Sequence, residues 1–229
     1  LTVKDYVELI RPVAGEELWA EFKRAGDVDL AYAADDIARF RVNLFMQSRG
    51  YGAVFRIIPS RLMTFAQLGL PKVLNRLCWL SKGLVLVTGP TGSGKSTTLA
   101  ALVNLFNEHR RCHVLLLEDP IEFAFKHGKS IIEQREIGHD CPSFSMALRH
   151  VVRQRPDVIF VGEMRDLETI SAALTAAETG HLVLASLHTS SADDAVNRMI
   201  DVFNGDRQLQ VRVQLSDTLR GVVCQTLFH

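Results

Sequence analysis

The chain has 229 residues, of which 47% are hydrophobic and 23% charged, and its formal net charge is zero. This length allows one large or two modest domains with a real core, and the composition is typical of soluble globular proteins. The zero net charge argues against a broad basic surface for nucleic acid or anionic membranes, and no apolar run approaches the roughly 20 residues of a membrane span.

The ends of the chain and its cysteines carry few signals. Leu1–Arg11 carries Lys4, Asp5 and Glu8, unlike a signal peptide. The four cysteines are scattered without a C-x-x-C pair, which favours reduced thiols in a cytosolic protein. Because the chain starts at Leu1 without Met and ends with no terminal signal, we expect a fragment or the ordered part of a longer protein.

Residues 1–58 predict a small α+β unit. Residues 3–24 mix apolar and charged side chains, which favours two short helices broken at Pro12 and Gly15. Alternating apolar and polar residues then predict strands, the last two forming a hairpin around a glycine-containing turn. The expected strands are 29–33, 39–45 and 53–58, with the turn at 50–52.

The expected hairpin brings three arginines, Arg39, Arg41 and Arg56, near one another. Charged residues on the open face of a sheet are the simplest interpretation. The segment Pro59–Pro71 predicts a connector, and 71–80 a short helix that leads into the second part of the chain.

From Gly83 onwards the pattern alternates strand and helix, and the strands are apolar runs without alternation, as in parallel strands buried on both faces. The expected strands are Leu84–Val87, Val114–Leu117, Val158–Val161 and Leu182–Leu184. The expected helices are Ser96–His109, Ser143–Arg153, Leu167–Glu178, Ser191–Val202 and about Arg207–Val223. This predicts an α/β layered domain, in which nucleotide binds at the carboxyl ends of the strands.

The sequence GPTGSGKS at Gly89–Ser96 fits the pattern G-x-x-x-x-G-K-[ST], and it joins an expected strand to an expected helix. Glycines let backbone N–H groups converge on an anion, and the helix dipole adds to the attraction. Lys95 would reach the β- and γ-phosphates, and the Ser96 hydroxyl would bind Mg²⁺. A chance glycine-rich turn is the alternative, but it would not explain the strand and helix on either side.

Carboxylates follow two of the expected strands. Glu118, Asp119 and Glu122 come directly after one strand, well placed for a metal or a water, although a solvated acidic loop is the alternative. Glu163 ends the hydrophobic strand 157–162, which is the Walker B position where a carboxylate holds Mg²⁺ directly or through water. A Glu replaces the usual Asp there, and an ordinary surface residue is the alternative.

Histidines and arginines leave more than one interpretation open. His181 and His188 stand at the two ends of a strand, on opposite faces if it is ideal, so a shared metal is not expected. Each histidine has either a structural or a catalytic role. Arg149 and Arg153 share a helix face, with Arg155 just beyond, and phosphate binding, pairing with an acid and simple solvation all remain open.

Several of these segments together resemble the secretion-superfamily ATPases, and within them the PilT-type retraction ATPases of type IV pili. The segments are RFRVN, VFRIIP, GPTGSGKSTT, EDPIE, VGEMRDLETI, LTAAETGHLV and SLHTSSA, and they cover nearly the whole chain in the family's order. Three of them correspond to the Asp box at Glu118–Glu122, the Walker B segment at Gly162–Asp166 and the His box at His181–His188.

The resemblance implies a PAS-like N-terminal domain at 1–60, a linker and connecting helix at 61–82, and a RecA-like P-loop ATPase domain at 83–229. It implies a homo-hexamer that binds ATP and Mg²⁺ between the two domains. The expected location is cytoplasmic, peripheral to the inner membrane. The expected partners are an inner-membrane pilus platform protein and a paralogous retraction ATPase, with no nucleic acid.

The resemblance also implies roles for individual residues. Glu122 would polarise the attacking water, and Glu163 would bind Mg²⁺ through water. The implied catalytic residues are Glu122, Glu163, Lys95 and His188, with Ser96 and Glu163 at the metal. The implied nucleotide-binding residues are Gly89, Pro90, Thr91, Gly92, Ser93, Gly94, Lys95, Ser96, Thr97, Arg41, Arg56, Arg149 and His181. Arg41 and Arg56 would reach the phosphates when the domains close.

The chain departs from the family pattern in two places. Arg155 stands where the family usually has Asp, and its effect stays open. The chain also ends near 225–227, where family members continue into a helical region with an AIRAGG-type motif.

The implied function is ATP hydrolysis that powers pilus retraction and twitching motility. One alternative is a pilus-assembly or type II/IV secretion ATPase, although such proteins usually carry an extra N-terminal domain and a four-Cys zinc motif that this sequence does not show. A second is a nucleotide-binding paralogue without turnover. A nucleic-acid motor is weaker, because the chain has no net positive charge.

Overall fold

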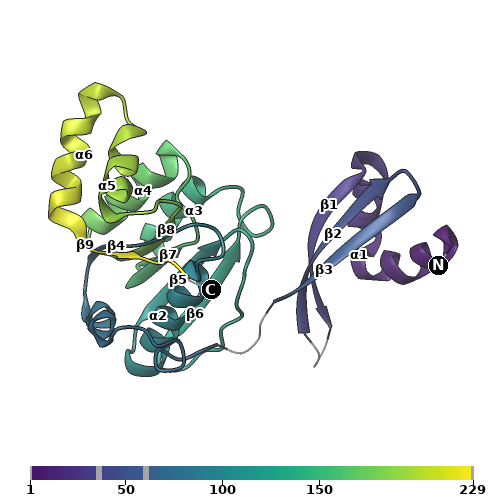
Figure 1. Ribbon diagram of the computed structural model, residues 1–229, viewed down its shortest axis with the longest axis horizontal. Helices are drawn as coiled ribbons and strands as arrows, with labels where there is room; N and C mark the ends of the chain where they lie inside the picture. The colour runs from purple at the N-terminus through teal and green to yellow at the C-terminus, as the bar shows by residue number, and fades with distance from the viewer. Residues whose placement is uncertain (1, 35–37, 59–61, 228–229) are drawn as a thin grey trace. The chain divides into compact units, whose positions relative to one another are not determined.

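The structure is a computed structural model that describes residues 2–34, 38–58 and 62–227. The chain divides into two compact units, Leu1–Arg61 and Leu62–His229 (Figure 1). The expected start of the connector at Pro59 and the expected domain boundary at residue 60 lie outside the described residues.

The smaller unit packs one helical element on a three-stranded antiparallel sheet of order β1-β2-β3. Its elements are α1 Val3–Ala25, β1 Asp27–Ala34, β2 Ala38–Gln47 and β3 Gly50–Ile58. The predicted break at Gly15 is confirmed, because Gly15 has φ 74° and ψ 167° and kinks α1. The predicted break at Pro12 is wrong, because Pro12 lies inside α1, where its fixed φ suits the helix and only one hydrogen bond is lost.

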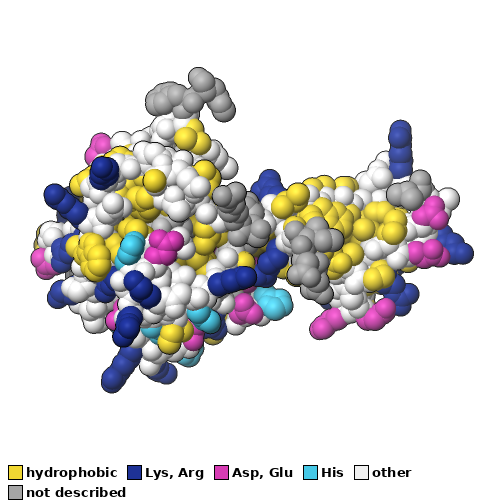
Figure 2. All heavy atoms as spheres, turned by 90° about the horizontal axis from the view of Figure 1, so that it is seen from below, with side chains coloured by type: hydrophobic (Ala, Val, Ile, Leu, Met, Phe, Trp, Pro, Cys, Tyr) yellow, Lys and Arg dark blue, Asp and Glu magenta, His cyan; other side chains and the backbone are white. Residues whose placement is uncertain are grey.

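The two faces of the small sheet differ in character. Trp19 and Phe22 of α1 pack on Val42 and Leu44 of β2, so the even-numbered residues of β2 face the helix. Arg41 lies opposite Arg56 in the β2–β3 register, and alternation places both on the other face. Figure 2 shows hydrophobic side chains gathered on the surface of this unit, and the exposed hydrophobic residues of β2 and β3 include Met46, Val54, Phe55 and Ile57.

The larger unit contains a six-stranded sheet of order β6-β5-β7-β8-β4-β9, in which every pair of neighbours is parallel. Its strands are β4 Gly83–Thr88, β5 His113–Glu118, β6 Ile131–Glu136, β7 Val158–Val161, β8 Leu182–Leu187 and β9 Leu219–Cys224. Its helices are η1 Lys72–Trp79, α2 Lys95–His109, α3 Phe144–Val151, η2 Val152–Gln154, α4 Leu167–Glu178, α5 Ala192–Asp201 and α6 Gly205–Thr218.

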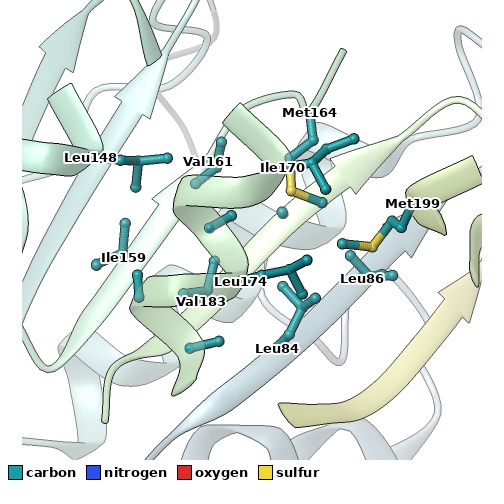
Figure 3. Close-up of a cluster of buried hydrophobic side chains, with 14 of the residues drawn as sticks. Leu84, Leu86, Leu148, Ile159, Val161, Met164, Ile170, Leu174, Val183 and Met199 are labelled. Atoms are coloured by element: carbon teal, nitrogen blue, oxygen red, sulfur yellow. The ribbon is translucent and has the colours of Figure 1, made fainter. Parts of the chain in front are cut away.

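Helices cover both faces of this sheet, which explains its apolar strands (Figure 1). Alternate residues of each central strand point to opposite faces. On β4, Val85 packs with α2, whereas Leu84 packs with the α3–α6 side, next to Val183 and Leu174 (Figure 3). Within the described residues, no helix combines the length and apolarity that a membrane crossing needs.

The structure corrects the sequence prediction at both edges of this sheet. The segment Leu219–Cys224, predicted as the end of a helix, forms β9 beside β4. The strand β6 was not predicted, because its sequence IIEQRE carries the polar residues of an edge strand. The short helix expected at 71–80 is a 3₁₀ helix over Lys72–Trp79. The remaining predicted strands and helices are present, with bounds shifted by a few residues.

Candidate nucleotide-binding and catalytic site

The glycine-rich loop lies between β4 and α2, as its sequence predicts. Gly94 precedes α2 with φ 86° and offers no side-chain cap, so the N–H groups of the first helical turn have no partner within the helix. The Ser93 hydroxyl is buried without a hydrogen-bond partner in the described part of the chain. Such a set of unsatisfied donors fits a phosphate group. Thr91 of the loop is exposed, and Ser96 and Thr97 are half-buried in the first turn of α2.

The Lys95 side chain folds back over this loop and is only 7% exposed. Its Nζ donates to the carbonyl oxygens of Gly89 at 2.9 Å and Pro90 at 3.0 Å. Burial lowers the pKa of Lys95, whereas the carboxylates of Glu163 and Glu122 act in the opposite direction. Both predicted catalytic acids therefore favour the charged form of Lys95.

Glu163 and His188 meet where β7 and β8 end. These strands are parallel neighbours in the sheet, and β8 also pairs in parallel with β4. The carboxyl ends of all three strands therefore lie side by side. His188 Nε2 lies 3.2 Å from Glu163 Oε1, and His188 Nδ1 lies 3.4 Å from Lys95 Nζ. The predicted Walker B acid and the predicted catalytic histidine are thus brought together beside the loop lysine.

Arg165 completes this cluster, with Nη2 at 2.7 Å from Glu163 Oε2. Burial raises the pKa of Glu163, but hydrogen bonds and positive charge from Arg165 and His188 outweigh it and hold the pKa below its usual value. Glu163 is therefore ionised at neutral pH. A cavity of about 450 Å³ opens beside these groups, lined by Glu163, Met164, Arg165, Leu187, His188, Thr189 and Arg198.

The three carboxylates at and after the end of β5 have different environments. Glu118 is only 6% exposed, and burial raises its pKa to about 7 although Gln134 and the Glu122 backbone N–H donate to it. Asp119 and Glu122 are exposed. The interpretation of a solvated acidic loop is therefore wrong for Glu118, while Glu122 is free to meet a substrate.

His181 lies away from this cluster. It precedes β8, and its carbonyl accepts from the Gly83 N–H at the start of β4. Six residues of strand separate it from the end of β8, a span of about 20 Å at the usual rise. Its Nδ1 lies 3.0 Å from the Ala176 carbonyl oxygen. His181 therefore lies at the opposite end of β8 from His188, and its expected role at the nucleotide stays a prediction.

The three predicted phosphate-binding arginines belong to two different units. Arg149 lies in the last turn of α3 with a side chain 68% exposed, 3.9 Å from Glu168. Arg41 and Arg56 belong to the smaller unit, and within the described residues neither takes part in an ion pair. Their role at the phosphates stays a prediction.

Arg155, the departure from the family pattern, has a left-handed backbone with φ 52°. Asp tolerates this conformation better than Arg, which gives a backbone reason for the residue usual in the family. The neighbouring Asp157, which matches the family pattern, accepts from the His113 N–H at 2.8 Å. This hydrogen bond joins the start of β5 to the residue before β7.

Sequence reasoning missed two residues of the site, Gln225 and Gln134. Gln225 Oε1 accepts from Thr98 Oγ1 of α2 at 2.8 Å, and the Gln225 N–H donates to the Thr88 carbonyl at 2.8 Å. Gln134 contacts the segment that carries Glu122. Gln225 follows β9 and Gln134 lies in β6, the two strands that were not predicted, so no signal pointed to either residue.

Over residues 2–34, 38–58 and 62–227, no group of three or more His, Cys, Asp or Glu side chains is arranged to hold an ion. Mg²⁺ in nucleotide sites is usually held by one or two protein oxygens together with the phosphates. The Ser96 hydroxyl and the ionised Glu163 carboxylate fit that donor set.

Residues 20–229 match the family model described as "Type II/IV secretion system protein". The chain is 49% identical, over 96% of its length and 64% of the relative's, to the type IV pilus retraction ATPase PilT of Pseudomonas aeruginosa. A type II secretion system protein E of Xanthomonas campestris is 37% identical over 82% of the chain and 32% of its own length.

Among solved structures, one described as the pilus retraction motor PilT with bound ADP matches with a TM-score of 0.93 and 47% identity. That match covers 96% of this chain and 64% of the PilT chain. The chain therefore spans slightly less than two thirds of the length of the PilT proteins it matches. The predicted α/β fold, with a RecA-like core preceded by a small antiparallel sheet, is confirmed by this similarity.

Proposed function

The chain belongs to the type II/IV secretion system protein family and, within it, to the PilT family, and on that premise we propose that it hydrolyses ATP to power type IV pilus retraction. The observation that carries the proposal is the cluster of Lys95, His188 and Glu163 at the carboxyl ends of neighbouring strands. A buried Lys95 on a phosphate-binding loop lies 3.4 Å from His188, which in turn lies 3.2 Å from Glu163.

Each residue of the cluster has a proposed task. The loop N–H groups and Lys95 bind the β- and γ-phosphates. Glu122, which is exposed and favours the charged form of Lys95, accepts the proton of the attacking water. His188 and Arg165 hold Glu163 ionised and oriented. Ser96 and Glu163 would hold Mg²⁺, which would neutralise part of the phosphate charge that develops in phosphoryl transfer.

The smaller unit supplies the proposed mechanical step. Arg41 and Arg56 are cross-strand neighbours on the face of its sheet that points away from α1. Their like charges make that face attractive to an anion. Their contact with the γ-phosphate, together with that of Arg149, would be made only when the domains close. Hydrolysis would then release the arginines and move one domain relative to the other.

We further propose the setting in which this motion does work. The protein forms a homo-hexamer at the cytoplasmic face of the inner membrane and acts on a pilus platform protein, alone or with a paralogous retraction ATPase. Retraction is preferred to secretion because the identity to PilT is 49%, against 37% to the type II secretion protein. Deleting the gene in its host tests this role: excess surface pili support retraction, whereas loss of pili contradicts it.

A steady-state ATPase assay on the full-length protein tests the proposed chemistry. Glu122→Gln removes the base and keeps the size of the side chain, so kcat should fall about 10²- to 10⁴-fold while ADP affinity is retained. Glu178→Gln, an exposed exchange at the end of α4, is the matched control and should behave as the wild type. An E122Q protein with wild-type turnover would exclude Glu122 as the base.

A further inference from the structure

We propose that Gln134 of β6 is a positioning residue that holds Glu122 in place for the ATPase reaction. This inference rests on the proposed function, in which Glu122 is the base. Glu122 itself lies in an exposed part of the segment after β5, where no helix or strand holds it. A general base has to be held within hydrogen-bond reach of its water, so something else must order this segment.

The side chain of Gln134 makes three hydrogen bonds around Glu122. Its Nε2 donates to the Phe123 carbonyl oxygen at 2.8 Å and to Glu118 Oε1 at 3.0 Å. Its Oε1 accepts from the Phe125 N–H at 2.9 Å. Gln134 thus binds the backbone directly after Glu122 and also the Glu118 carboxylate, which accepts from the Glu122 N–H.

Two acids complete the same framework. Glu118 Oε2 accepts from the Glu122 N–H at 3.4 Å, and Glu136 Oε2 accepts from the Ile121 N–H at 3.1 Å. The strands β5 and β6 are paired with Glu118 opposite Glu136. Both side chains therefore project from backbone that the sheet hydrogen bonds hold in place. Gln134 differs from Glu118 and Glu136 because its side chain bonds both to the backbone of the segment and to another side chain of the framework, that of the buried Glu118.

The chemistry of these contacts requires an amide at position 134. The Phe123 carbonyl and the Glu118 carboxylate need donors, and the Phe125 N–H needs an acceptor. An ionised carboxylate at this position would lose both donors and face the charge of Glu118. A methionine would fill a similar volume without any of the three bonds. The Gln134→Met exchange therefore removes the hydrogen bonds and leaves most of the packing.

The first test separates kcat from nucleotide binding in the full-length protein. Gln134→Met should lower kcat about 10- to 100-fold, as expected when a reacting group is displaced by about 1 Å, and leave the ADP Kd within about twofold. The adjacent Glu133→Met, an exposed position on the same strand, is the matched control and should keep wild-type kcat. A Q134M protein with wild-type kcat, or with kcat and ADP affinity lost together, would overturn the positioning role.

A double-mutant cycle then identifies the residue through which Gln134 acts. In an E122Q background Q134M should cause no further loss, because the positioned base is already absent. An additive loss would show that Gln134 acts elsewhere. If E122Q alone keeps full turnover, the proposed base fails. If E122Q is impaired but Q134M is not, only the positioning role fails. Should Q134M not fold, Gln134→Asn, which shortens the side chain by one methylene, should show the same selective loss of kcat.

Discussion

Glu118 should make the stability of the larger unit depend on pH, and Glu118→Gln should remove that dependence. Glu118 ends β5, is only 6% exposed, and has its pKa raised by burial from 4.5 to about 7. An unfolded chain releases this proton near pH 4.5, whereas the folded chain keeps it to about pH 7. Between these two values the folded state binds more protons than the unfolded state.

The sign and size of the effect follow from that difference. The free energy of unfolding falls as pH rises from 4.5 to about 7, and the loss is complete above pH 7. At about 1.4 kcal/mol for each pH unit, the contribution of Glu118 is about 3 kcal/mol. E118Q carries no ionisable group there. Its free energy of unfolding should therefore rise by about 3 kcal/mol relative to the wild type between about pH 5 and pH 8.

Urea unfolding followed by circular dichroism measures this change at each pH, provided that the two proteins unfold with equal m-values. A constant offset between E118Q and the wild type is expected from the altered hydrogen bonds to Gln134 and Glu122, and it does not affect the slope. Glu178→Gln, an exposed exchange, should keep the wild-type slope. If E118Q and the wild type change in parallel over this range, the pKa of Glu118 is not raised and the argument fails.

Two further predictions concern the loop and the core. Lys95→Met should weaken ATP binding about a thousandfold by calorimetry, because a cation about 4 Å from a phosphate charge contributes about 4 kcal/mol near a protein surface; an affinity within about threefold of the wild type would contradict this. Leu174→Ala should lower the free energy of unfolding by about 3 kcal/mol, since Leu174 is 1% exposed and packs beside Leu84 and Val183 (Figure 3). Leu209→Ala, 73% exposed, is its control and should change stability by less than about 0.5 kcal/mol.

The central strands of the larger unit could be predicted because their apolar composition indicates burial on both faces. The strands β4, β5, β7 and β8 lie in the middle of the sheet and bury both faces, so each is an apolar run. The edge strands β6 and β9 each pair with only one neighbouring strand, and they carry polar residues such as Gln134 and Arg220. Their pairing with β5 and β4 is a long-range contact that a local pattern does not contain.

The candidate site could be predicted where position on a strand determines proximity. Lys95, Glu163 and His188 follow three strands that end at one edge of a parallel sheet, so their meeting follows from the topology. Burial is a different kind of information. Nothing in EDPIE distinguishes the first glutamate, which is buried at the end of β5, from the second, which is exposed.

The two histidines show how topology decides between residues that a resemblance treats alike. His181 and His188 both belong to the family's His box, but they flank β8 at opposite ends. In a parallel sheet, the loop of β4 lies at the carboxyl end, beside His188, and Gly83 lies at the amino end, beside His181. Of the two, His188 is therefore the histidine that lies beside the phosphate-binding loop of the same chain. The direction of the strand, which the sequence already contains, is enough to separate the two roles.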